Sequence, residues 1–422
     1  MPLNQSMHNE ISGLSSQAIE SWLSDLTAQV PEFAVLQPQQ GHAGTAGYYH
    51  TLREICQQPL TWLDTSARVV GSLERLRAIV DESGLSAKRG ALIFTGSGSS
   101  FYAGECLGLT LQRELAVPVH AIPAGLILTH PETALPPSQD SLVVSLARSG
   151  DSPESTAVVD LLDELYPCIR HVIITCNQSG RLAAFRRDDP GCATLVLDDA
   201  TCDRSLVMTS SFSNLVWAGR ALGLLRSPGI YQAETEALVA AAKQLLARKS
   251  GEISDLGRQT FQSVLYLGSG VRLGSARESA LKMLEMTAGQ VVTFAETYLG
   301  VRHGPLAAVQ SDTLIVCFLS SDPLVRAYEL DLIRELTQKK LGLRKVIVGE
   351  QVPVDIGQPQ DHVIDYSTGT GLGDETLPML DVLVGQLLAF FRCLSLGLRP
   401  DAPSREDIIN RVVGHFAIHR RA

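Results

Sequence analysis

Three charged side chains between positions 275 and 287 carry the most suggestive chemistry in this chain. Glu278, Lys282 and Glu285 follow one another at spacings of four and three residues, which places them on one face of a helix. An ion pair on a solvated surface is the ordinary interpretation of that pattern. The catalytic interpretation is that a carboxylate moves a proton between carbon atoms while the neighbouring amine meets a carbonyl group.

A histidine follows this predicted helix in the segment Arg302-His-Gly-Pro305. A single histidine in a loop usually has no special role. Together with the two carboxylates and the amine, however, the imidazole of His303 would complete the set that aldose–ketose chemistry requires, because it can assist the opening of a sugar ring. Glu278 would be a second acid or base, or would hold Lys282.

Two turns rich in glycine and serine precede this region. The segments Gly96-Ser-Gly-Ser-Ser100 and Ala147-Arg-Ser-Gly-Asp-Ser152 each follow an apolar strand and lead into a predicted helix. Backbone N–H groups at such a helix start favour an anion, although one turn alone could simply cap its helix. Two such turns at the carboxyl ends of parallel strands meet at one crevice. We therefore expect a phosphate to bind Ser97, Gly98, Ser99, Ser100, Ser149 and Ser152.

The elements that carry these residues occur twice. Gly96 and Gly268 each end a strand and are 172 positions apart, and Asp140 and Asp312, which each begin a further strand, have the same separation. One offset for two motifs indicates an internal duplication. Strands that alternate with helical segments predict α/β domains, each with a doubly wound parallel sheet.

We predict four segments along the chain. Residues 1–74 form a helical lead-in, 75–235 a first domain that binds phosphate, 236–395 a second domain with the catalytic helix and the histidine loop, and 396–422 a tail that closes the site. At the offset of 172, Ser99 and Ser100 correspond to Val271 and Arg272. The second copy thus loses these hydroxyl groups, which places the phosphate in the first.

Composition excludes several classes of protein. The chain has 422 residues, with 35 Lys and Arg against 45 Asp and Glu, and its net charge of -10 opposes binding to nucleic acid or an anionic membrane. Residues 1–13 lack the features of a secretory signal. The apolar run at 382–391 is too short for a membrane span and predicts a buried helix. Eight cysteines without a CxxC pair indicate reduced thiols in the cytoplasm and no metal site.

These motifs resemble those of the sugar isomerase (SIS) family, and in particular the isomerase half of glucosamine-6-phosphate synthase. The resemblance runs from about residue 53 to the end of the chain and is carried by four segments in the same order, Gly98-Ser-Ser100, Ser149-Gly-Asp-Ser152, Glu278-Ser-Ala-Leu-Lys-Met-Leu-Glu285 and Arg302-His-Gly-Pro305. It implies two tandem SIS domains and no cofactor. It also implies that Glu285 shuttles the proton, that Lys282 engages the open-chain sugar, and that His303 comes from a neighbouring subunit of a homodimer.

The chain also departs from the synthase. Its first 50 or so residues are unrelated to the glutaminase half and lack the catalytic N-terminal cysteine, so glutamine is not its ammonia source. Arg411 aligns with a tail lysine of the family, remains charged and cannot form an imine, and we expect it to bind substrate. Ala147 replaces a serine that is usual in the phosphate site.

Longer segments, 94–105 and 203–212, are most similar to AgaS-type members of the family. The resemblance implies conversion of galactosamine 6-phosphate and water to tagatose 6-phosphate and ammonia. Two alternatives stay open. One is a tagatose-6-phosphate ketose/aldose isomerase that releases no ammonia, and the other is a non-catalytic sugar-phosphate sensor, although the acidic chain shows no basic N-terminal DNA-binding domain.

Overall fold

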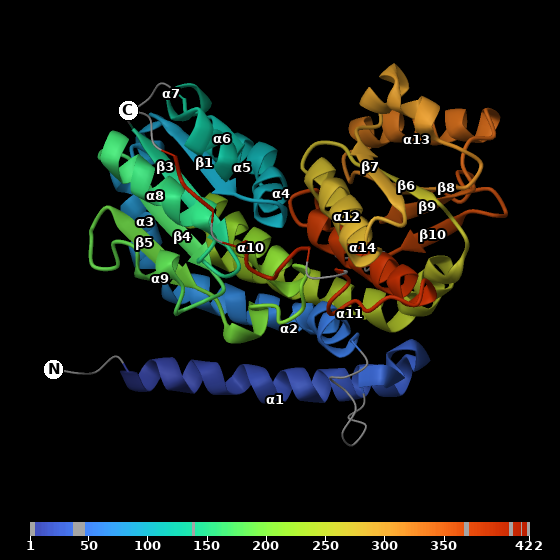
Figure 1. The fold of residues 1–422 in the computed structure, drawn as a ribbon, viewed down its shortest axis with the longest axis horizontal. Helices are drawn as coiled ribbons and strands as arrows, with labels where there is room; N and C mark the ends of the chain where they lie inside the picture. The colour runs from blue at the N-terminus through green and yellow to red at the C-terminus, as the bar shows by residue number, and fades with distance from the viewer. Residues whose placement is uncertain are drawn as a thin grey trace.

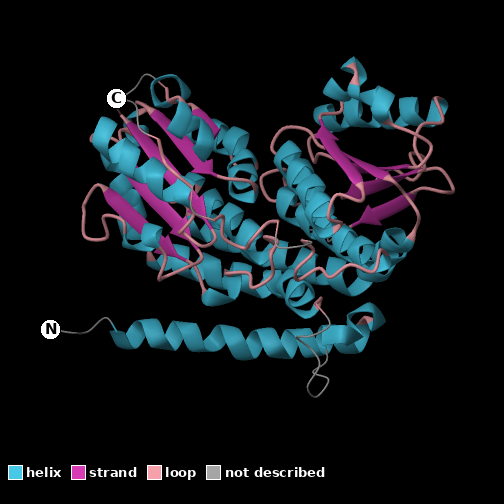
Figure 2. Cartoon of the chain, viewed as in Figure 1, coloured by secondary structure: helices cyan, strands magenta, loops and turns pink. Residues whose placement is uncertain are grey.

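The computed structural model describes residues 5–36, 47–136, 140–366, 371–404, 408–414 and 416–419. Two parallel five-stranded sheets lie side by side, with helices between and around them (Figures 1 and 2). The first sheet has the order β2-β1-β3-β4-β5, with strands β1 Ala91–Gly96, β2 Val119–Pro123, β3 Ser141–Ala147, β4 Arg170–Thr175 and β5 Cys192–Val196. The second has the order β7-β6-β8-β9-β10, with β6 Ser263–Leu267, β7 Val292–Glu296, β8 Thr313–Phe318, β9 Arg344–Gly349 and β10 His362–Asp365.

The two sheets repeat one another in strand order and in register. Ala91 of β1 pairs with Ser141 of β3, and Ser263 of β6 pairs with Thr313 of β8. Both partners of the second pair are 172 positions beyond those of the first. The predicted α/β architecture with two tandem parallel sheets is confirmed. The exact limits of the four predicted segments stay a prediction.

Helices cover both faces of the first sheet. On one face, Ile93 and Val143 pack against α6 Ala124–Thr129 and α8 Pro153–Leu165. On the other, Leu92 and Val144 join a core with further helices, which are α2 Tyr49–Gly71, α3 Leu73–Glu82, α4 Ser99–Glu105, α5 Gly108–Leu115 and α10 Ser210–Arg220. Two single-turn helices lie in the connections between strands: α7 Pro131–Ala134 precedes β3, and α9 Arg181–Ala184 lies between β4 and β5. Alternate residues of one strand thus face opposite layers, as in a doubly wound sheet.

The second sheet is covered in the same way. Ile315 and Ile347 pack against α13 Pro323–Gln338. The opposite face, with Val316, packs against α12 Arg272–Met286 and α14 Leu377–Ser395. This face belongs to the same continuous core as the face of the first sheet that carries Leu92 and Val144. The long helix α11 Pro228–Arg258 contacts both α2 and α14, so it joins the two halves.

Helix α1 Gln5–Gln29 runs along the outside of the molecule beside α2 (Figure 1). The indole Nε1 of Trp22 donates a hydrogen bond to the carbonyl oxygen of Cys56 at 2.9 Å. Lys243 of α11 lies over the same ring. The predicted helical lead-in therefore packs on the core helices, at least over its second half.

The apolar run at 382–391 lies within α14. This helix is long and apolar enough to cross a membrane by length and composition, yet every residue from Leu377 to Cys393 is buried in the protein. It packs against α11 and α12. The prediction of a buried core helix is confirmed.

A buried ion pair fixes the start of α12 on α14. The guanidinium of Arg272 donates from Nε to Oδ2 of Asp381 at 2.8 Å and also bonds the hydroxyl of Tyr366. Arg272 and Asp381 are both fully buried. Ser275 adds a further hydrogen bond to the same carboxylate. Helix α12 is therefore anchored by charge as well as by apolar packing.

We expect Asp381→Ala to lower the free energy of unfolding by about 3–5 kcal/mol, because it leaves the Arg272 charge buried without its partner. Urea unfolding followed by circular dichroism measures the change. Asp331→Ala is the control, since its pair with Arg334 is exposed and should contribute at most about 1 kcal/mol. Equal effects of the two substitutions would contradict this account.

Candidate active site

Glu278, Lys282 and Glu285 form a charge cluster in the interior rather than on a solvated surface. The ammonium nitrogen of Lys282 lies 3.2 Å from Oε1 of Glu278 and 2.5 Å from Oε2 of Glu285. Lys282 and Glu278 are fully buried, whereas the side chain of Glu285 is 25% exposed. Of the three charged groups, Glu285 is therefore the one that a substrate can reach.

Burial and neighbouring charge set the protonation of this cluster. Burial lowers the pKa of Lys282, but Glu278 and Glu285 outweigh that effect and hold the pKa above its usual value. The amine therefore stays protonated and acts as a cation rather than as a nucleophile. Burial also raises the pKa of Glu278, against the pull of Lys282, to about 7.

The first glycine- and serine-rich turn meets this cluster from the other domain. The hydroxyl of Ser99, at the start of α4, accepts a hydrogen bond from Nζ of Lys282 at 3.1 Å. Helices α4 and α12 face each other between the two sheets (Figure 1). Gly98 precedes α4 with a φ of 55°, a left-handed conformation that glycine adopts without strain. The turn and the catalytic helix thus meet as parts of one site.

The second turn follows β3 at the same edge of the first sheet. Gly150 has a φ of 68°, and a Cβ there would come within 3.2 Å of the Thr175 hydroxyl oxygen, so glycine is required. The Ser149 hydroxyl accepts a hydrogen bond from the backbone N–H of Asp151. In the parts of the chain that the structure describes, the hydroxyls of Ser97 and Ser152 have no protein partner. They are available to a ligand.

Two arginines add positive charge at the second turn. Arg148 is buried, and its guanidinium donates to the carbonyl oxygens of Leu206 and Arg411. The guanidinium of Arg411 in turn donates to the carbonyl oxygen of Asp203 at 2.6 Å. Among the described residues, no carboxylate forms an ion pair with either arginine. Their charges are therefore not neutralised by a direct ion pair within the described residues.

Arg148 is a candidate that our sequence analysis did not single out. Burial lowers its pKa, as does the charge of Arg411, whereas Asp203 and Glu285 raise it. An arginine in this setting stays charged. An arginine inside a glycine- and serine-rich turn was the signal that could have revealed it.

A loop formed by residues 202–209, here called the 202–209 loop, supports both arginines. Its Asp203 carboxylate accepts hydrogen bonds from the backbone N–H groups of Thr209, Ser210 and Ser211, which begin α10. Glu54 of α2 accepts from the backbone N–H of Arg204. Buried carboxylates thus fix the carbonyl groups to which the arginines bind.

The corresponding turns of the second domain are filled by the protein's own carboxylates. Asp374 accepts hydrogen bonds from the Ser320 hydroxyl and from the backbone N–H of Ser321. Glu329 accepts from the backbone N–H of Ser320 at 2.7 Å, and Ser269 also bonds to it. The donors that could bind an anion are therefore already satisfied here, which supports phosphate binding in the first domain alone.

His303 is not brought to the cluster within this chain. It ends a short 3-10 helix, Gly300–His303, and its side chain is exposed. No described contact joins it to Glu278, Lys282 or Glu285. The structure therefore groups the two carboxylates, the lysine, both turns and Arg411 around one region, and leaves His303 at the surface.

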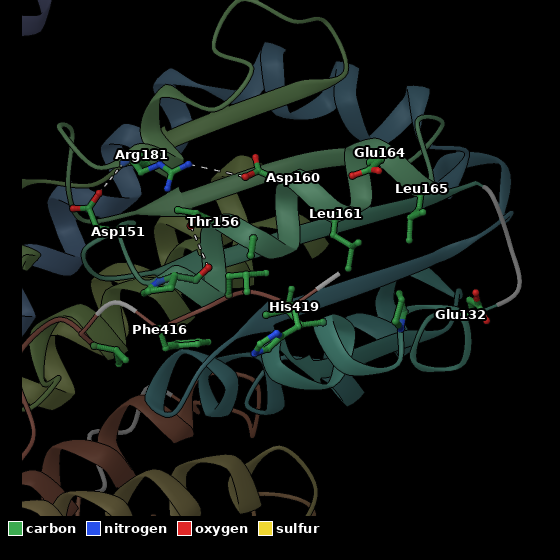
Figure 3. A pocket seen from close by; sticks show the side chains of 16 residues that line it. Glu132, Asp151, Thr156, Asp160, Leu161, Glu164, Leu165, Arg181, Phe416 and His419 are labelled. Carbon is green, nitrogen blue, oxygen red and sulfur yellow. Dashed lines mark hydrogen bonds and ion pairs between the residues drawn. The ribbon is translucent and has the colours of Figure 1, made fainter. Parts of the chain in front are cut away.

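A separate cavity of about 590 Å³ opens between α8 and the C-terminal segment (Figure 3). Arg181 lies between Asp151 and Asp160 in its wall, while Phe416 and His419 come from the C-terminal segment. None of Glu278, Lys282 and Glu285 lines it. Its titratable residues are mainly acidic, with Glu132 and Glu164 besides the two aspartates, so the cavity suits a phosphate poorly.

The pKa of Glu278 predicts how stability depends on pH. Because burial raises this pKa to about 7, the folded protein keeps a proton that the unfolded chain loses near pH 4.5. The contribution of this group to stability is thus complete below about pH 4.5 and is lost as the pH rises through about 7. Glu278→Gln cannot ionise, so its free energy of unfolding should fall less between pH 5 and pH 8. Urea unfolding at both values measures this, and equal falls in both proteins would contradict the assignment.

Comparison with known proteins identifies the family to which this chain belongs. No protein-family profile matches the chain. The D-galactosamine-6-phosphate deaminase AgaS of Shewanella sp. (strain ANA-3) is 34% identical over 370 residues, covering 87% of this chain and 91% of that protein. AgaS of Escherichia coli is 32% identical over 381 residues, covering 87% of this chain and 95% of its own.

Solved structures agree with these relatives. A tagatose-6-phosphate ketose/aldose isomerase from Escherichia coli superimposes with a TM-score of 0.78 at 28% identity, covering 91% of this chain and 99% of that one. The C-terminal domain of glucosamine-fructose-6-phosphate aminotransferase from Francisella tularensis shares the fold, with a TM-score of 0.67 at 19% identity and coverage of 84% and 98%. The chain belongs to the AgaS family of proteins with two sugar isomerase (SIS) domains.

Proposed function

We propose that this protein is an enzyme that converts galactosamine 6-phosphate and water to tagatose 6-phosphate and ammonia. One observation carries the proposal: the partly exposed carboxylate of Glu285 is held by a buried, charged Lys282 directly opposite the first turn. A sugar phosphate bound to the turns of the first domain would present its carbons 1 and 2 to that carboxylate. The names of the AgaS relatives agree with this substrate.

The chemistry follows from these groups. Once the ring has opened, Glu285 removes the proton from carbon 2 and returns it to carbon 1 by way of an enolamine, which leaves an imine at carbon 2. Water then adds to the imine, and ammonia leaves as the ketone forms. Lys282 stabilises the negative charge that develops on the oxygen at carbon 1. The substrate's own amine and carbonyl accept the electrons, so the proposal needs no metal or organic cofactor.

Phosphate binding rests on the two turns and the arginines. We assign the phosphate to the hydroxyls of Ser97, Ser100, Ser149 and Ser152, with the positive charges of Arg148 and Arg411 beside them. Charge-assisted hydrogen bonds of this kind are the stronger ones in proteins. They offset the repulsion that a net charge of -10 exerts on an anionic substrate. We propose the cytoplasm as the site of the reaction.

A ketose/aldose isomerase is the second candidate. It is favoured by the similarity to the Escherichia coli isomerase structure and by the fact that Glu285 could move the same proton when carbon 2 carries oxygen in place of nitrogen. In that case no imine forms and no ammonia leaves. Glu285 has the same role in both reactions, and only the group on carbon 2 differs.

A coupled assay for ammonia tests the proposal. We expect the enzyme to release ammonia from galactosamine 6-phosphate in step with tagatose 6-phosphate, and Glu285→Gln to lower turnover by roughly 10²- to 10⁴-fold, the contribution of a positioned general base. Glu252→Gln, in a partly exposed ion pair with Lys249 on α11, is the control. Interconversion of tagatose and galactose phosphates without ammonia release would favour the second candidate. Near-normal turnover of Glu285→Gln would remove the assigned base.

His303 requires a second subunit in this proposal. Because it is exposed and no contact among the described residues joins it to Glu285, we propose that it enters the site of a neighbouring chain in a homodimer and assists ring opening there. A symmetric dimer would exchange the two histidines between its two sites.

Mixing two inactive variants tests that arrangement. In a mixed dimer of His303→Ala and Glu285→Gln chains, one site has both functional residues, so random pairing should restore about a quarter of the wild-type activity. Native mass spectrometry verifies that mixed dimers have formed. If verified mixed dimers stay inactive, His303 and Glu285 act from the same chain.

A further inference from the structure

Two neighbouring serines of the first turn serve different partners. The hydroxyl of Ser99 accepts a hydrogen bond from Nζ of Lys282 at 3.1 Å, and its side chain is 4% exposed. The hydroxyl of Ser100 lies instead near the sulfur of Met208 in the 202–209 loop, at 4.0 Å. Ser99 therefore faces the catalytic helix of the second domain, whereas Ser100 faces the wall of the phosphate turn.

Tight packing between the helices fixes the position of Ser99. A Cβ added to Gly274 of α12 would come within 2.7 Å of the sulfur of Cys106 and 2.8 Å of its backbone nitrogen. Arg277 of α12 forms an ion pair with Glu105 at the end of α4. The two helices thus approach so closely that only glycine fits between them, and the separation of Ser99 from Lys282 has little freedom.

Ser99 also completes the hydrogen bonding of Lys282. An ammonium group has three N–H donors, and three oxygen-bearing groups surround this one: Glu278, Glu285 and Ser99. Lys282 is fully buried, so a lost partner is not replaced by bulk water. Without the Ser99 hydroxyl, the ammonium would be drawn toward Glu278, whose Oε1 is 3.2 Å away, because Oε2 of Glu285 is already in close contact with it.

We propose that Ser99 is a positioning residue whose hydroxyl holds the ammonium of Lys282 at a fixed place beside Glu285, rather than a ligand of the phosphate. The proposal rests on the function proposed above and changes the role that our sequence analysis gave to Ser99. The first turn then has two roles. Ser97 and Ser100 bind the substrate, and Ser99 holds the ammonium group of Lys282 from the second domain.

Kinetics of three variants test this role. We expect Ser99→Ala to lower kcat by roughly 10- to 100-fold, as expected when a catalytic group is misplaced by about 1 Å, with little change in KM. Ser99→Thr keeps a hydroxyl and should recover most of the activity. Ser100→Ala should raise KM with a smaller effect on kcat. A rise in KM as the main effect of Ser99→Ala would return this hydroxyl to the phosphate site and overturn the proposal.

A pH profile adds a readout that a merely structural role would not change. Burial raises the pKa of Glu278, whereas Lys282 and the neighbouring Ser99 hydroxyl lower it. Removal of the hydroxyl should therefore raise the apparent pKa of the cluster, and the acid limb of the kcat/KM profile should move to higher pH in Ser99→Ala but not in Ser99→Thr. An unmoved limb in Ser99→Ala would count against the proposal.

Crystal structures of the wild type, Ser99→Ala and Ser99→Thr keep this test independent of the substrate. We expect Nζ of Lys282 to move by more than about 0.5 Å in Ser99→Ala, toward Glu278, whose Oε1 is 3.2 Å away, a shift that exceeds the tolerance of a catalytic arrangement, and to keep its place in Ser99→Thr. An unmoved ammonium overturns the positioning role whatever the substrate is. Absence of ammonia release by the wild type would instead overturn the proposed function.

Discussion

The contact of Lys282 with Ser99 and with two carboxylates is the interaction on which the candidate site depends. It brings a buried cation of the second domain against a turn of the first. A buried charge is costly unless it is fully paired, so the two domains must keep one relative position. The continuous core along α2, α11 and α14 supplies the rigidity that this requires.

The two domains arose by duplication, yet equivalent turns in them have different charges. The sheets have the same order and register, yet their turns hold opposite charges. In the first domain, Arg148 and Arg411 leave positive charge beside serine hydroxyls. In the second, Asp374 and Glu329 occupy the equivalent donors. In our proposal the first copy binds an anion, and the second carries the acid and base groups on helix α12.

Burial also separates the roles of the two carboxylates. Glu278 is enclosed, and its pKa of about 7 results from that enclosure, whereas Glu285 keeps part of its side chain in solvent. A fully enclosed carboxylate can tune its neighbours but cannot touch a sugar. A partly exposed one, paired with a fixed ammonium, can exchange a proton with a carbon atom.

The sequence by itself determined the fold class, the duplication and the identity of the three charged residues, because strand periodicity and helical spacing are local properties and a constant offset can be read directly along the chain. Only the tertiary structure decided that Glu278 and Lys282 are buried, that Ser99 faces Lys282, and that Arg148 lies beside Arg411. Those facts arise from contacts between residues more than 100 positions apart. No local pattern encodes them, since they depend on how α4 packs against α12 and on where the C-terminal segment meets the second turn.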